Sequence, residues 1–127
     1  LSFVGRLYAG INFLISMFAG AVSFFVVKSI FEISRPVEVI THVTGWSFPS
    51  GHTTMATIVF LLTIYFFKDF IKKDLYRKIF VEIFALLIAL VAVSRIYLGA
   101  HFFSDVLGGF LLGLAIVCIS VIFFRTK

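Results

Sequence analysis

Three short clusters of polar residues stand out in this 127-residue chain because their side chains could bind and cleave a phosphate ester. They are Lys28 with Arg35-Pro36, then Pro49-Ser50-Gly51-His52, then Ser94-Arg95 followed by His101 and Asp105. Lysine and arginine bind phosphate oxygens, and histidine can act as a nucleophile or transfer protons. The clusters therefore indicate chemistry on a phosphate group.

The first cluster could grip one phosphate with two cations. Lys28 and Arg35 are seven residues apart, so they share a helix face if the first helix continues past the membrane boundary. Pro36 would then end that helix. The arginine fork and the lysine ammonium could bind different oxygens of one group. The alternative is a surface ladder in which Glu32 pairs with both.

The second cluster stands where a second helix should begin. Pro49 near a helix start, with Gly51 letting an anion approach unpaired backbone N–H groups, forms an anion site. Ser50 can add a hydroxyl donor. His52, on the first turn, suits proton transfer to a leaving group. A capping turn with an incidental histidine is the alternative.

The third cluster suggests a nucleophile. His101 and Asp105 are four residues apart and share a face if their helix begins by residue 101. An aspartate there can accept one ring N–H and leave the other ring nitrogen free and basic. Such a histidine is a good nucleophile. A structural pair is the alternative, although ionisable residues this close to a bilayer are functional hypotheses by default.

The elements that must position these residues are membrane helices. Hydrophobic residues make up 61% of the chain, charged residues only 13%, and the mean hydropathy is +1.15. Runs at 7–27 and 106–124 can each cross roughly 30 Å of hydrocarbon. Runs at 53–67 and 79–93 are predicted to span as well. A signal peptide is the alternative for the first run, but that run is too long and leads directly into Lys28. We expect one all-α domain over residues 1–127, an integral membrane bundle of four transmembrane helices.

Basic residues divide unequally between the two loop faces that four spans create. One face holds Arg6, Lys68, Lys72, Lys73, Arg77, Lys78, Arg125 and Lys127; the other holds Lys28, Arg35 and Arg95. By the positive-inside rule the first face is cytoplasmic, so the three clusters face outward, toward the periplasm or exterior. The net charge of +5 thus reflects topology, and no nucleic-acid partner is indicated. The 68–78 loop is expected to be solvated and to touch anionic lipid headgroups.

Two features of the last span bear on assembly. Gly109 and Gly113 form a small-xxx-small pair that lets a second helix approach closely. Core packing within one subunit is favoured over a dimer contact, so an oligomer is not indicated. Cys118 is the chain's single cysteine and is expected to pack as a small apolar residue.

Together the clusters match K-x6-R-P, then P-S-G-H, then S-R-x5-H-x3-D without a substitution, from Lys28 to Asp105. On these motifs the chain resembles the type 2 phosphatidic acid phosphatase (PAP2) superfamily, which also takes in vanadium haloperoxidases and glucose-6-phosphatase-like enzymes. The resemblance covers most of the chain. Because the combined pattern is highly specific, it outweighs the separate alternatives for each cluster.

The resemblance implies which positions would bind phosphate. The side chains of Lys28, Arg35 and Arg95 would hold the phosphate oxygens. Ser50 and the backbone N–H of Gly51 would complete the cradle. No metal and no other cofactor is implied.

It also implies three catalytic positions. His101 would attack phosphorus to give a phosphohistidine, held and activated by Asp105. His52 would protonate the leaving group and later help water attack the covalent intermediate. The expected activity is metal-independent hydrolysis of a lipid phosphate monoester or pyrophosphate at the outer face of a bacterial cytoplasmic membrane.

The resemblance names candidate substrates and leaves other classes open. Phosphatidylglycerophosphate, undecaprenyl pyrophosphate and phosphatidic acid are candidates, with lipid A as an alternative, and bacterial members of the phosphatidylglycerophosphatase B type look most similar. Integral-membrane members commonly have six spans, which implies two further helices before Leu1. The high mean hydropathy of the chain argues against a vanadate-dependent haloperoxidase, because those relatives are soluble. A non-catalytic scaffold or transport protein would be expected to have lost a motif residue, and none is lost.

Overall fold

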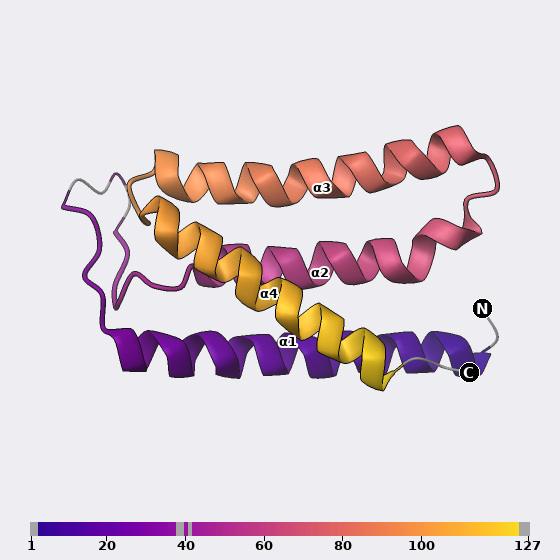
Figure 1. Ribbon diagram of the computed structural model, residues 1–127, viewed down its shortest axis with the longest axis horizontal. Helices are drawn as coiled ribbons and strands as arrows, with labels where there is room; N and C mark the ends of the chain where they lie inside the picture. Colours follow the sequence, from indigo (N-terminus) through magenta and orange to yellow (C-terminus); the bar gives the residue numbers. More distant parts are fainter. Residues whose placement is uncertain (1–2, 38–39, 41, 125–127) are drawn as a thin grey trace.

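The computed structural model describes residues 3–37, 40 and 42–124, and its regular structure there is helical (Figure 1). The long helices are α1 (Phe3–Phe31), α2 (Gly51–Phe67), α3 (Asp74–Tyr97) and α4 (Phe103–Phe123), and a short 3-10 helix, η1 (Lys68–Phe70), follows α2. All four, α2 together with η1, are long and apolar enough to cross a membrane. The expected all-α fold with four spans is confirmed.

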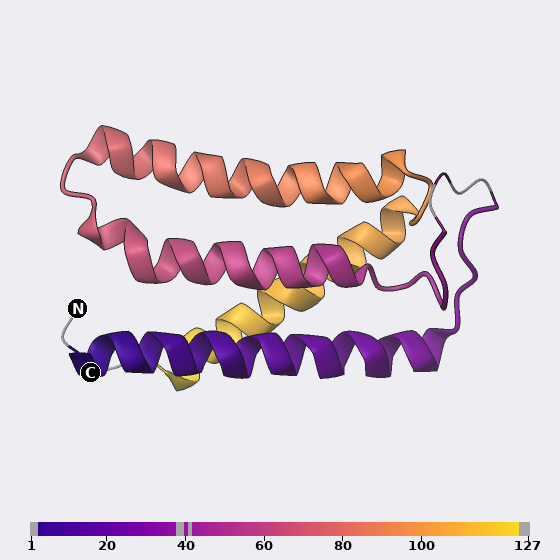
Figure 2. The ribbon, with the colours of Figure 1, turned by 180° about the vertical axis from the view of Figure 1, so that it is seen from behind.

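Helix α2 lies at the centre of the bundle. Helices α1, α2 and α3 run side by side, and α4 crosses one face of this layer obliquely (Figures 1 and 2). Helix α2 contacts each of the other three long helices. The α1–α2 loop and the α3–α4 turn lie at one end of the bundle, whereas the start of α1, the end of α4 and the α2–α3 connection lie toward the other. All three motifs therefore meet at one end.

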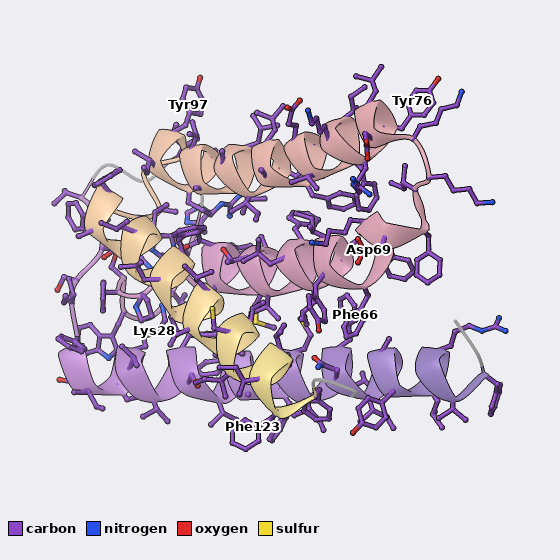
Figure 3. The ribbon with its side chains drawn as sticks, turned by 45° about the vertical axis from the view of Figure 1, so that its right-hand side comes forward. Lys28, Phe66, Asp69, Tyr76, Tyr97 and Phe123 are labelled. Atoms are coloured by element: carbon purple, nitrogen blue, oxygen red, sulfur yellow. The ribbon has the colours of Figure 1, made fainter. Side chains whose placement is uncertain are left out.

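The basic residues sort between these two ends as expected. Figure 3 shows Lys28 near the end that carries the motifs, and Asp69 and Tyr76 near the opposite end, where the 68–78 basic segment connects α2 to α3. Arg125 and Lys127, which were assigned to that same end, lie outside the described residues. The charge asymmetry that underlies the topology prediction is thus present in the fold.

The glycine pair in α4 packs against α2. A Cβ atom on Gly109 would lie 2.5 Å from the Ser50 carbonyl oxygen, and one on Gly113 would lie 2.8 Å from the Thr54 carbonyl oxygen. The buried hydroxyl of Thr54 donates back to the Ser50 carbonyl at 2.9 Å, so it leaves no unpaired donor between the helices. Gly109 and Gly113 are therefore core packing residues within one subunit, as favoured from the sequence.

A polar contact joins α1 and α4 deeper in the bundle. Ser16 and Ser120 each donate to the Asn12 Oδ1 atom, at 3.1 and 2.5 Å, and their own hydroxyl oxygens lie 2.8 Å apart. All three side chains are buried. Such hydrogen bonds between helices support association in a bilayer, where the hydrophobic effect does not distinguish side chains from lipid tails.

Two helix boundaries differ from the sequence-based expectation. Helix α1 ends at Phe31 and Glu32 takes a left-handed backbone conformation (φ 47°), so Arg35 lies in the following loop and does not share a helix face with Lys28. The condition under which the two residues would share a helix face, a first helix that continues to Pro36, is therefore not met. Helix α4 begins at Phe103, so His101 precedes it. Both residues are positioned by loops that the helical spacing did not anticipate.

We expect Gly109→Ala to lower the free energy of unfolding in detergent by about 1–3 kcal/mol, because the new methyl group would overlap a backbone carbonyl of α2. Gly10→Ala is the matched control, since a Cβ there has no neighbour within 4 Å. That substitution should be neutral or stabilising by up to about 1 kcal/mol. Thermal or denaturant unfolding of the two variants measures the difference, and equal effects would contradict the α2–α4 contact.

Candidate active site

A cavity of about 590 Å³ opens where the α1–α2 loop meets the start of α2. Its lining combines charged, imidazole and apolar side chains: Phe24, Phe25, Lys28, Arg35, Thr44, Gly45, Gly51, His52, Met55 and His101. Residues from all three motifs therefore surround one space. The apolar part of the lining comes from α1 and α2, one turn deeper in the spans than the motif residues.

Backbone carbonyl groups of the α1–α2 loop hold the two cations of the first motif. Lys28 Nζ donates to the Trp46 carbonyl at 2.6 Å. Arg35 Nε donates to the Gly45 carbonyl at 3.0 Å, and Nη2 donates to the Thr44 carbonyl at 3.2 Å. Neither cation pairs with Glu32 among the described ion pairs, so the surface-ladder alternative is not what the structure contains.

These contacts leave donors available on both cations. An ammonium group has three N–H donors and a guanidinium has five. Lys28 uses one donor, whereas Arg35 uses further donors toward the Ala100 carbonyl at 2.8 Å and toward His101 Nε2 at 3.3 Å. Lys28 thus retains two N–H groups and Arg35 one, together with their full charges. The loop carbonyls therefore orient both cations and leave each of them with at least one N–H donor for a ligand.

The start of α2 offers further donors. Ser50 is the N-cap residue, and its buried hydroxyl oxygen accepts from the Thr53 N–H at 3.4 Å. Gly51 and His52 follow in the first turn, where N–H groups have no intrahelical acceptor. Packing also favours glycine at position 51, since a Cβ atom there would lie 3.2 Å from the Phe24 ring. The first turn of α2 therefore joins hydrogen-bond donors to the cations of the first motif.

His101 lies between Arg35 and Asp105. Its Nε2 atom is 3.3 Å from Arg35 Nη1, and its Nδ1 atom is 3.5 Å from Asp105 Oδ2. A guanidinium can only donate, so Nε2 must accept and the ring proton belongs on Nδ1, facing the carboxylate. This tautomer places a lone pair on the ring nitrogen that faces Arg35.

The surroundings of His101 keep its imidazole neutral. Burial, and next the positive charge of Arg35, lower the pKa of His101 to about 4, although Asp105 acts in the opposite direction. Burial also lowers the pKa of Arg35, but a guanidinium stays charged at any ordinary pH. At neutral pH the site therefore pairs an uncharged imidazole with a fixed cation.

The eight positions expected from the sequence occupy different layers of the site. Lys28, Arg35, Gly51, His52 and His101 line the cavity. The other three, Ser50, Arg95 and Asp105, do not.

Each of these three residues lies behind the residues that line the cavity. Ser50 caps α2 in place of offering its hydroxyl to the cavity, and Asp105 stands behind His101. Arg95 accepts from the Ala100 and His101 N–H groups through its carbonyl, at 3.1 and 3.3 Å, and is close enough to His52 to interact with it electrostatically. The structure thus brings Arg95 near the site without placing it in the lining.

Several residues of the cavity lining and its surroundings were not anticipated from the sequence. Phe24 and Met55 stand one helical turn from Lys28 and Gly51, and that spacing could have identified them. Ser47 is fully buried and donates a hydrogen bond to Asp105 Oδ2. Nothing local marks Ser47, since it lies in an irregular loop and its partner is 58 residues away.

Comparisons with known proteins agree with this geometry. Phosphatidylglycerophosphatase B of Bacillus subtilis (strain 168) is 41% identical over 93 residues, which cover 70% of this chain and 45% of the relative. The crystal structure of a transmembrane PAP2 type phosphatidylglycerolphosphate phosphatase from Bacillus subtilis superposes with a TM-score of 0.84 and 33% identity. That match covers 91% of this chain and 59% of the other. The chain thus spans about half the length of the curated relative it matches.

The family comparison covers nearly the whole chain. The family model of the PAP2 superfamily matches residues 9–127, a range that includes all three motifs, the whole of α2, α3 and α4, and α1 from residue 9 onward. The motif spacing, the transmembrane fold and the cavity at one end of the bundle are consistent with that match. This chain therefore belongs to the PAP2 superfamily.

Proposed function

We propose that this chain hydrolyses the phosphate group of a membrane lipid through a phosphohistidine on His101, without a metal ion. One observation supports this most directly: the unprotonated Nε2 atom of His101 lies beside Arg35, in the lining of a cavity that also holds Lys28 and His52. A nucleophile, phosphate-binding cations and a proton donor are thereby gathered around one space.

The first step forms a bond between His101 Nε2 and phosphorus. The bond from phosphorus to the leaving oxygen breaks, and protonated His52 gives its proton to that oxygen. Lys28, Arg35 and the first-turn N–H groups of α2 stabilise the charge on the non-bridging oxygens. Asp105 stabilises the positive charge that develops on the imidazole ring.

The second step regenerates the enzyme. His52, now neutral, removes a proton from a water molecule that attacks phosphorus. The bond between phosphorus and His101 Nε2 breaks, and inorganic phosphate leaves. The same cations serve both steps because both pass through a similarly charged transition state.

The apolar wall of the cavity favours a lipid substrate. Phe24, Phe25 and Met55 line it on the side of the spans, so a phosphate held by Lys28 and Arg35 would keep its hydrocarbon part among the helices. Phosphatidylglycerophosphate is our first candidate, because the matched relatives carry that substrate in their names. Undecaprenyl pyrophosphate, phosphatidic acid and lipid A have the same division into phosphate and tail.

We further propose that the cavity faces the periplasm or the exterior of a bacterial cytoplasmic membrane. This orientation is supported by the basic residues at the opposite end of the bundle, in particular those of the 68–78 segment. The positive-inside rule favours a cytoplasmic position for such residues.

Phosphate release in detergent with EDTA tests the activity. The panel comprises phosphatidylglycerophosphate, undecaprenyl pyrophosphate, phosphatidic acid and lipid A. We expect release by the wild-type protein and a loss of about three orders of magnitude or more in His101→Ala, because the nucleophile is gone.

His42→Ala is the matched control, since His42 is exposed and does not line the cavity. It should retain wild-type activity. Release from none of the lipids, or equal release by His101→Ala, would contradict the proposed hydrolysis. Loss of release with EDTA would contradict the metal-free mechanism alone.

Thiol labelling tests the orientation. In a Cys118→Ala background, a cysteine at exposed position His42 should react with a membrane-impermeant reagent in intact bacteria. A cysteine at exposed position Lys72, at the opposite end, should react only after lysis. The other basic residues of that end remain in place. The reverse pattern of labelling would overturn the outward-facing site.

A further inference from the structure

We propose that Ser47 is a positioning residue for this reaction: its hydroxyl helps to fix the Asp105 carboxylate opposite His101 and takes up part of the negative charge of that carboxylate. The inference deepens the proposed function and rests on it for its effect on turnover. Ser47 belongs to none of the three motifs, and its contacts alone single it out.

The contacts of Asp105 converge on a single oxygen atom. Both Ser47 and Asp105 are fully buried, and the Ser47 hydroxyl donates to Asp105 Oδ2. The same oxygen accepts from the Phe102 N–H at 2.7 Å and lies 3.5 Å from His101 Nδ1. Among the described residues, Asp105 Oδ1 has no hydrogen-bond partner. Ser47 and Phe102 therefore decide which carboxylate oxygen faces the imidazole.

The backbone around Ser47 also carries the cation contacts. The Ser47 N–H donates to the Ile33 carbonyl at 2.6 Å, which attaches this loop to the segment after α1. The preceding carbonyl, that of Trp46, accepts from Lys28, and the one before it, that of Gly45, accepts from Arg35. Through its side chain, Ser47 thus connects the loop that orients both cations to the carboxylate behind the nucleophile.

Removing the Ser47 hydroxyl changes what the carboxylate does. A hydrogen bond from a hydroxyl to an ionised carboxylate is among the stronger ones and disperses part of its charge. Without that donor, Asp105 keeps the Phe102 N–H and draws more strongly on the proton of His101. The attraction between Asp105 and protonated His101 then offsets more of the opposing effects of burial and of the surrounding cations.

Among the described residues, several charged or titratable groups act on His101 or lie at its cavity, and one of them is an anion. They are Lys28 from α1, Arg35 from the loop after it, His52 from α2, Arg95 from α3 and Asp105 from α4. Because Asp105 is the one group in this set that raises the pKa of His101, any change in its hydrogen bonding acts on that pKa directly. Because the Phe102 N–H still holds Asp105 Oδ2 opposite the imidazole, we expect Ser47→Ala to raise the pKa of His101 from its lowered value.

Histidine NMR titration of the full chain, in detergent without substrate, measures this effect. The chain contains three histidines, so the His101 signal can be assigned with the His101→Ala variant. We expect the pKa of His101 to rise in Ser47→Ala and the acid limb of kcat/KM to move to higher pH. We also expect kcat to fall by about 10-fold to 100-fold with KM little changed, by analogy with the loss of hydrogen-bonded partners of metal-ligating histidines.

Three further variants separate the hydrogen bond from packing. Ser47→Cys keeps the side-chain volume but replaces the hydroxyl by a weak thiol donor, so it should resemble Ser47→Ala. Ser47→Thr keeps the hydroxyl and should restore a low pKa of His101. Ser104→Ala removes an exposed serine beside Asp105 and should match the wild type in all readouts.

The outcomes distinguish the two proposals. A wild-type pKa of His101 in Ser47→Ala would overturn the positioning role, whether or not kcat or the unfolding temperature falls. Wild-type behaviour of Ser47→Cys would do the same, because packing would then account for the effect. A raised pKa of His101 in a protein that hydrolyses none of the lipids would support the positioning role and contradict the proposed function.

Discussion

The close approach of α4 to α2 determines where the functional groups lie. Gly109 and Gly113 carry no Cβ, so the α4 backbone reaches the carbonyl groups of Ser50 and Thr54. At the open end of this contact, the Ser50 N–H donates to the Asp105 carbonyl at 2.9 Å. The start of α2 and the start of α4 are thereby joined through their backbones. Two motifs that are distant in sequence become neighbours because of a packing constraint within the membrane.

From that junction the site is built by satisfying buried polar groups. Asp105 lies in the junction and is fully buried, so its carboxylate needs donors, and Ser47 and Phe102 supply them. The α1–α2 loop that carries Ser47 also presents carbonyls to Lys28 and Arg35. The orientation of the proposed nucleophile, His101, and that of the two proposed phosphate-binding cations therefore depend on one loop.

The electrostatic character of the site follows from this arrangement. Among the described residues at the site, cations outnumber the single carboxylate, that of Asp105, and burial favours the neutral form of His101. A neutral imidazole beside Arg35 and Lys28 is suited to attack an anion that those cations hold. Fixed positive charges need no reorganisation as negative charge moves across the phosphate oxygens. This accounts for a site in which charge is concentrated at the mouth of an otherwise apolar bundle.

The sequence predicted the spans and the grouping of the motifs, but not how loops complete the site. Long apolar runs identify membrane helices because few other structures can satisfy the backbone hydrogen bonds of such segments inside a bilayer. Helical spacing failed for Arg35, since α1 ends at Phe31 and the left-handed Glu32 redirects the chain. Contacts made by the carbonyls of Thr44 and Gly45 leave no side-chain signature. The role of Ser47 depends on a partner that only the folded chain brings close.

The central claim is that His101 forms a covalent bond to phosphorus during turnover, and trapping of that intermediate tests it most directly. The protein is mixed with a phosphorus-labelled lipid phosphate, quenched in alkaline denaturant, digested, and mapped by mass spectrometry. We predict label on His101 alone, and no label in His101→Ala, because the phosphoryl group is carried by its Nε2 atom. Label on another residue, or turnover without any label on His101, would contradict the account.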